Sequence, residues 1–213
     1  MKKSDVKKLL DREFKLRLGK GVKKAKYNWI KPFGDLYIRF GYGIVDSDNS
    51  FPSSFYYSIG SLLFSNTMNH IIKSKKLNIQ EDKYIAAIGT GQITLFDEGR
   101  YPVLEYDIYT EQDAQKMVDE VSDYILNTIL PPWEANPTVE YLEKQVNSEV
   151  KDSPNFSGLI LSKIVDGSDY ELIKNTLVNY SNDWSEFDKN DLIQVIEFLD
   201  NHSSEELRLL GGL

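Results

Sequence analysis

Apolar residues recur along the chain first with a helical period, then with a period of two, and then with a helical period again. Near the N-terminus, Val6, Leu10 and Phe14 are spaced by four residues, which predicts a helix over Ser4–Leu18. Apolar residues then alternate with small or polar ones over Asp35–Ile44, so that Leu36, Ile38 and Phe40 share one face. This alternation predicts a strand with one buried and one open face.

Five further segments have the composition of strands: Ala25–Ile30, Phe55–Ser61, Tyr84–Ile88, Gln92–Asp97 and Pro102–Tyr109. Turn sequences separate the last three, so these are expected to form an antiparallel meander. The polar run Asp46–Ser54 predicts a loop, and Asn66–Lys76 predicts a short helix.

The pattern is helical from Thr110 onward. Thr110 and Asp113 form a variant of the capping box, and Pro131-Pro132 are expected to end the helix that follows it. Further helices are predicted over Phe156–Val165, Asp169–Tyr180, Lys189–Leu199 and Ser204–Leu210, with a capping box from Ser168 to Glu171 before the second.

These elements predict an α+β protein. Its antiparallel β-sheet of five or six strands is flanked by helices and is followed by an α-helical C-terminal half. The polar segment Asn147–Asn155 contains Pro154 and is the best candidate linker. We therefore expect an α+β domain over residues 1–147 and a helical subdomain over residues 148–213, either separate or packed together as one unit.

The chain contains no cysteine, which excludes disulfides, thiolate metal sites and cysteine nucleophiles. This composition fits a reducing cytoplasm, where we expect the protein to reside. The basic N-terminus has no apolar segment after it, so no secretory signal is expected, and no apolar run is long enough to span a bilayer.

Charge is divided unevenly along the chain. Residues 1–31 carry 12 Lys/Arg against 3 Asp/Glu, whereas residues 110–213 carry 7 against 21. The basic end is expected to hold an anionic partner or to dock on the chain's own acidic half. The acidic half is suited to a basic partner, because opposite fields steer encounter. Within it, Glu140, Glu143 and Glu149 are our candidates for a binding face.

Two further sets of residues are candidates for chemistry. Glu105 and Asp107 share one face of a predicted strand, where paired carboxylates can serve as general acid and base if burial separates their pKa values. Arg39 is the only charge within its strand and is a candidate for holding an anionic group. The alternative, that Arg39 pairs with Glu105 or Asp107 on a neighbouring strand, stays open.

Other motifs are incomplete. Asp46-Ser-Asp48 begins like a calcium loop, but Phe51 and Tyr57 occupy the positions that need Gly and Glu. Gly89-Thr-Gly91 is a lone GxG between two predicted strands, which indicates a turn. The two histidines, His70 and His202, lie far apart in sequence. We therefore expect no metal, no cofactor and no assigned catalytic residue.

Several features of residues 1–147 resemble the uncharacterised family known as domain of unknown function 4304. They are the opening helix, Lys23-Lys24 before Tyr27 and Trp29, the Phe55-to-Gly60 strand, and the long helix closed by Leu130-Pro-Pro-Trp133 before a second helix over Thr138–Asn147. The resemblance implies an α+β fold and no established activity, so it transfers no catalytic residue. The loop Asp46–Ser54 is longer than this resemblance implies.

The sequence favours a non-enzymatic protein-binding module with an acidic interaction face, of the immunity or inhibitor type, whose partner is a protein with a basic surface. Two alternatives stay open. One is a small hydrolase that uses the carboxylates of the sheet face. The other is a nucleic-acid-associated protein that uses the basic N-terminus, which the acidic remainder of the chain disfavours.

Overall fold

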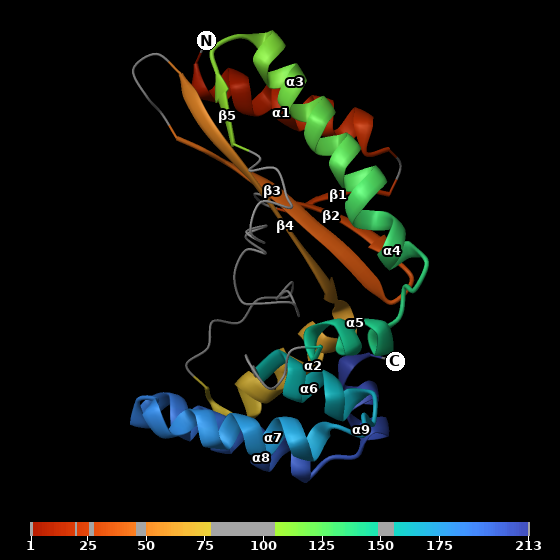
Figure 1. Ribbon diagram of the computed structural model, residues 1–213, viewed down its shortest axis with the longest axis vertical. Helices are drawn as coiled ribbons and strands as arrows, with labels where there is room; N and C mark the ends of the chain where they lie inside the picture. Colours follow the sequence, from red (N-terminus) through yellow and green to blue (C-terminus); the bar gives the residue numbers. More distant parts are fainter. Residues whose placement is uncertain are drawn as a thin grey trace. The chain divides into compact units, whose positions relative to one another are not determined.

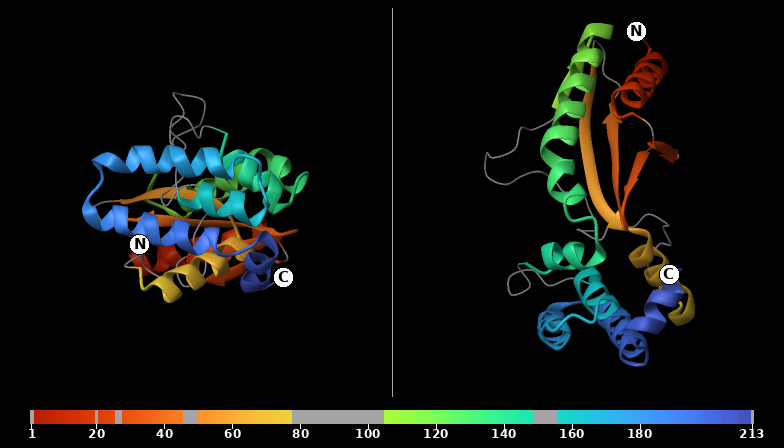
Figure 2. Two further views of the ribbon diagram at one scale, coloured as in Figure 1. Left: turned by 90° about the horizontal axis from the view of Figure 1, so that it is seen from below. Right: turned by 90° about the vertical axis from the view of Figure 1, so that its right-hand side faces the viewer.

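A computed structural model describes residues 2–19, 21–25, 28–45, 50–77, 105–148 and 156–212 (Figures 1 and 2). The chain divides into two compact units, which are considered one at a time below. The sheet unit comprises Met1–Ser58 and Gln92–Pro137, and the helical unit comprises Ile59–Gly91 and Thr138–Leu213. The helix over Val139–Val146 therefore groups with the C-terminal helices. That residues 148–213 fold as a separate subdomain stays a prediction.

The sheet has the order β1-β2-β3-β4-β5, with β1 (Lys23–Ala25), β2 (Asn28–Phe33), β3 (Leu36–Ile44), β4 (Phe51–Ser61) and β5 (Glu105–Ile108). β2 pairs antiparallel with both β1 and β3, placing Trp29 opposite Phe40 and Ile30 opposite Arg39. β5 pairs antiparallel with β4, with Phe51 opposite Ile108. Strands that follow one another in sequence are thus neighbours in space, as short connections favour.

The α+β class is confirmed, but the predicted sheet of five or six strands is wrong, because β1 and β5 are only short edge pieces of three and four residues. Only three strands in the described part of the chain, β2, β3 and β4, are longer than four residues, and the described chain is mostly helical. The predicted strand Ala25–Ile30 divides between β1 and β2, and β4 begins at Phe51 inside the predicted loop. The predicted strands Tyr84–Ile88 and Gln92–Asp97 lie outside the described residues.

Helix α1 (Lys3–Arg17) supplies the core of the sheet unit with Val6, Leu10 and Phe14, as its spacing predicted. The ring of Phe14 packs against those of Trp29 and Phe40, whose centroids lie 5.6 and 6.4 Å away. Trp29 and Phe40 stack on each other at 5.8 Å. α1 therefore covers the face of β2 and β3 that carries these rings.

The opposite face is not open, contrary to our expectation. Tyr37, which shares it with Arg39, is only 2% exposed, and Ile30 is buried as well. Period-two alternation shows which residues share a face, but it does not show whether a second layer covers that face.

Helix α3 (Glu111–Tyr124) begins with the predicted capping box: Thr110 Oγ1 accepts from the Asp113 amide, and Asp113 accepts from the Thr110 amide. Pro131-Pro132 do not end the helical path, which corrects our expectation. A π-helical turn, η1 (Ile125–Ile129), leads into α4 (Leu130–Glu134), where both prolines lie in the first turn. Proline is tolerated there because a first turn leaves its amide hydrogens unused.

The turn between β2 and β3 touches the chain beyond α4. The Asp35 amide donates to the Pro137 carbonyl at 3.0 Å, and Lys31 Nζ lies 3.2 Å from Glu134 Oε1. Gly34 has φ +53°, and a Cβ there would lie 2.5 Å from the Pro137 oxygen. Only glycine fits this turn without strain.

The helical unit is built from α2 (Leu62–Lys75), α5 (Val139–Val146), α6 (Phe156–Ile164), α7 (Tyr170–Tyr180), the 3₁₀ turn η2 (Ser181–Asp183), α8 (Glu186–Asp200) and α9 (Ser204–Gly211) (Figure 1). The helices predicted after residue 156 are all present, but α7 begins after Asp169 without a side-chain cap, so the predicted capping box is wrong. A Cβ on Gly211 would lie 2.2 Å from Leu63 Cδ1, so α9 approaches α2 closely.

Candidate functional site

Arg39 lies near the middle of β3, half-buried on the face it shares with Tyr37. The sheet order places β4 between β3 and β5. Arg39 therefore does not lie on the strand next to that of Glu105 and Asp107, and its pairing with either carboxylate stays a prediction. The predicted anion-binding role of Arg39 stays a prediction.

The two carboxylates of the predicted acid-base pair lie in β5, opposite Ser54 and Pro52 of β4. Asp107 is exposed and makes no ion pair with any residue that the structure describes, while the side chain of Glu105 is outside the described part. The described residues therefore show no buried pair of carboxylates at this position, and the acid-base role stays a prediction.

Two carboxylates of the predicted acidic face have partners inside the helical unit, while the binding role of this face stays a prediction. Glu140 in α5 accepts from Arg208 of α9 at 2.7 Å, and Glu143 accepts from Asn147 Nδ2 at 2.8 Å. Burial alone would raise the pKa of Glu140, but the hydrogen bond and charge of Arg208 and the hydrogen bonds from the backbone and Thr138 together outweigh burial and lower that pKa. Glu149 lies outside the described residues. Two of the three carboxylates therefore stabilise the helical unit itself.

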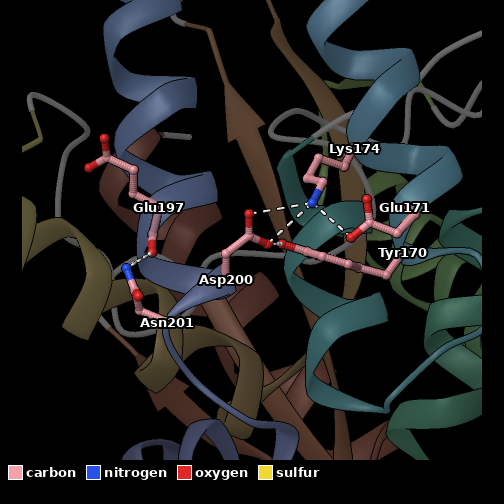
Figure 3. A network of polar contacts seen from close by, with 6 residues as sticks. All are labelled: Tyr170, Glu171, Lys174, Glu197, Asp200 and Asn201. Atoms are coloured by element: carbon pink, nitrogen blue, oxygen red, sulfur yellow. Dashed lines mark hydrogen bonds and ion pairs between the residues drawn. The ribbon is translucent and has the colours of Figure 1, made fainter.

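A polar network joins the start of α7 to the end of α8 (Figure 3). The Tyr170 hydroxyl donates to Asp200 Oδ1 at 2.8 Å. Lys174 Nζ lies 2.7 Å from Glu171 Oε1 and 3.4 Å from Asp200 Oδ2. Asp200 lies at the C-terminal end of α8, where its negative charge is repelled by the negative end of the helix dipole. The donors Tyr170 and Lys174 compensate for this repulsion.

This network holds two helices together and is not set up for catalysis. Burial, and then the hydrogen bond to Asp200, raise the pKa of the Tyr170 hydroxyl, so Tyr170 stays a protonated donor. Burial alone would lower the pKa of Lys174, but its two carboxylate partners outweigh it and raise that pKa. A nucleophile or a base needs the opposite shifts.

Acidic residues dominate the segment that follows the linker. Residues 156–212, here called the acidic segment, contain 11 Asp/Glu and 4 Lys/Arg. The four basic side chains are all engaged within the helical unit. Lys174 and Lys189 pair with carboxylates on their own helices, Arg208 pairs with Glu140, and Lys163 lies over the Tyr170 ring at 4.9 Å. The excess of carboxylates is therefore left to the surface.

One acidic residue of the acidic segment has little exposed surface. Asp191 in α8 is 7% exposed and lies on the same helical stripe as Val195 and Phe198, which are also buried. Among the described residues it has no hydrogen-bond or ion-pair partner. Burial, and then the nearby charge of Asp188, raise the pKa of Asp191. The sequence signal was available, because Asp191 occupies a position that the apolar period of α8 would assign to the core.

The two histidines lie beside one residue, which sequence spacing did not reveal. The His202 ring stacks on Phe198 with centroids 4.1 Å apart, and the His70 ring is 6.1 Å from the same phenylalanine. His202 Nδ1 donates to the Phe198 carbonyl at 2.7 Å and so caps the end of α8. No group of three or more His, Asp or Glu side chains among the described residues is arranged to hold a metal ion.

The basic N-terminal region differs from the expected surface of lysines and exposed aromatics. Trp29 is buried beneath Phe14, so it does not offer a stacking face to a nucleobase, and Tyr27 lies outside the described residues. Arg17 pairs with Asp119 of α3 at 2.5 Å, and Lys31 pairs with Glu134. The alternative in which the basic end docks on the chain's own acidic half therefore holds for these two residues.

No protein-family model, no curated protein and no solved structure matches this chain. The resemblance to domain of unknown function 4304 therefore stays a prediction. In the described ranges, no helix combines the length and the apolar character needed to cross a membrane.

Proposed function

We propose that this protein is a non-enzymatic binding module that captures a basic protein through its acidic segment. One observation carries the proposal: the four basic side chains of the segment are used in internal contacts, while most of its 11 carboxylates are exposed. An approaching protein would therefore meet a negative field that few local cations screen.

Such a field acts mainly on the rate of encounter. Opposite charges raise association rates by orders of magnitude at low salt, and the gain falls as ionic strength rises. An immunity or inhibitor protein that must mask a basic toxin or enzyme quickly benefits from this property. The absence of cysteine supports a cytoplasmic setting for the encounter.

The first test is affinity capture from the native host with the full chain as bait, at about 50 mM and about 500 mM salt, a range over which screening shortens the reach of surface charge. The proposal expects a basic partner that is retained at low salt and largely lost at high salt. An acidic partner, or recovery that does not depend on salt, would contradict it.

The second test measures association of the purified partner with two variants of equal net charge. Asp183→Asn with Glu205→Gln removes two exposed carboxylates from the acidic segment, while Glu111→Gln with Asp123→Asn removes two from α3 in the sheet unit. We expect the first pair to slow association by roughly threefold or more, with little change in dissociation. If both pairs slow it equally, net charge alone is responsible and the acidic segment is not the binding surface.

A further inference from the structure

Exposed apolar side chains concentrate on α7 and α8. Among the described residues, nine large apolar side chains are exposed, and four of them lie between residues 170 and 200: Leu172, Val178, Tyr180 and Ile193. A single exposed apolar residue is ordinary on a protein surface, whereas several on one continuous face indicate a binding surface. The question is therefore which of these four side chains share a face.

The network in Figure 3 identifies the sides of α7 and α8 that face each other. Lys174 Nζ of α7 lies 3.4 Å from Asp200 Oδ2 of α8, which joins the start of one helix to the end of the other. The helices are connected through the short η2, so they run antiparallel. Residues four or seven positions apart share one face of a helix.

Three apolar residues continue these two sides away from the ion pair. Val178, at 45% exposure, lies four residues after Lys174 on α7. Ile193, at 55% exposure, and the half-buried Ile196 lie seven and four residues before Asp200 on α8. Val178, Ile193 and Ile196 therefore border the boundary between the two helices and are here called the apolar seam.

Carboxylates outnumber basic groups at both ends of the apolar seam. Each end has two carboxylates and one lysine: Glu171, Asp200 and Lys174 at one end, and Asp183, Glu186 and Lys189 at the other. Because α8 runs from Glu186 to Asp200, the two ends are about 21 Å apart at the ordinary helical rise. An apolar surface is therefore flanked on both sides by net negative charge.

We propose that the apolar seam binds an amphipathic helix of the basic partner, whose apolar stripe packs on the seam and whose lysine or arginine residues lie beside the carboxylates at both ends. This inference rests on the proposed function and names the surface that captures the partner. Amphipathic helices bind apolar grooves through residues spaced by three and four positions. Charge complementarity selects a basic helix, because an acidic helix would be repelled at both ends.

The apolar and the charged residues should then affect different rates. The exposed carboxylates of the acidic segment act at a distance and set association, whereas contacts made only in the complex set dissociation. Truncation of the apolar seam should therefore speed dissociation of a bound helix with little change in association.

The test titrates the ¹⁵N-labelled full chain, at fixed ionic strength, with an amphipathic peptide of about 14 residues, a length that spans the seam. The peptide has leucines at helical spacing and lysines at both ends, and a scrambled peptide of the same composition is its control. We expect amide shift changes to centre on residues 174–178 and 189–200, and the scrambled peptide to bind at least about tenfold more weakly.

Val178→Ala with Ile193→Ala should weaken binding of the helical peptide about tenfold or more. Leu172→Ala with Leu209→Ala is the matched control, because these leucines are 49% and 64% exposed in the same acidic segment but lie outside the seam. The control pair should weaken binding less than about twofold. All four substitutions replace exposed side chains, so each variant should melt at the temperature of the wild type.

Equal weakening by the two pairs, equal binding of the scrambled peptide, or shift changes centred elsewhere would overturn the helix site while leaving the proposed function intact. No binding of the helical peptide to the wild type would also overturn it. Shift changes at the seam on dilution without peptide would assign it to a second copy of the chain instead. The proposed function fails separately, if the captured partner is not basic or associates independently of salt.

Discussion

The contact between the β2–β3 turn and Pro137 makes a quantitative prediction for Gly34→Ala. Gly34 has φ +53°, so a Cβ there costs roughly 1–2 kcal/mol in backbone strain alone. That Cβ would also lie 2.5 Å from the Pro137 oxygen and 2.6 Å from its Cβ, which forces the turn away from Pro137. Overpacking of this kind adds roughly 1–3 kcal/mol. We therefore expect a total loss of roughly 2–5 kcal/mol in the free energy of unfolding.

Gly19→Ala separates the two contributions. Gly19 has φ +76°, but nothing lies within 4 Å of its ideal Cβ, so that substitution should cost only the roughly 1–2 kcal/mol of strain. Urea unfolding followed by tryptophan fluorescence measures both variants. In a Trp184→Phe background the signal comes from Trp29 and Trp133, which belong to the sheet unit. Equal losses for Gly34→Ala and Gly19→Ala would show that the close approach to Pro137 does not exist.

Three further outcomes are expected. Phe40→Ala removes a ring that is 1% exposed and should cost about 3–5 kcal/mol in urea melts, whereas Leu16→Ala, at 69% exposure, should cost less than about 0.5 kcal/mol. Glu140→Gln should lower thermal stability at pH 7, and this loss should shrink as pH falls below the ordinary 4.5, because a carboxyl whose pKa is lowered by folding loses its stabilising contribution as pH falls through the folded pKa. Asp191→Asn should raise thermal stability at pH 7 and not at about pH 3. The pKa of Asp191 is raised above 3.8, so the folded state favours the protonated carboxyl. The stability that this proton contributes is lost as pH rises through the folded pKa.

Local patterns predicted local structure well. The stripe of Val6, Leu10 and Phe14 identified the buried face of α1, and the alternation through β3 placed Phe40 in the core. The capping pair Thr110 and Asp113 marked the start of α3. Each of these inferences depends on residues within about four positions of one another, a range in which spacing alone fixes which side chains meet.

Sequence patterns did not reveal contacts between distant segments. Tyr37 was assigned to an open face because Asp35 and Arg39, two positions away on the same face, are polar, yet it is 2% exposed. Glu140 was assigned to a binding surface, but its partner is Arg208, 68 positions away in sequence. Periodicity carries no information about which segment covers a face or which cation reaches a carboxylate, so the pattern of one sequence leaves these choices open.

The division of charge along the chain is therefore a poor guide to what a partner meets. Part of the basic N-terminal charge is used inside the sheet unit, where Arg17 contacts Asp119 and Lys31 contacts Glu134. In the helical unit the basic residues are used in the same way, but carboxylates remain in excess after pairing. Exposed pairs of this kind contribute little to stability, so their main effect is to decide which charges stay unmatched at the surface.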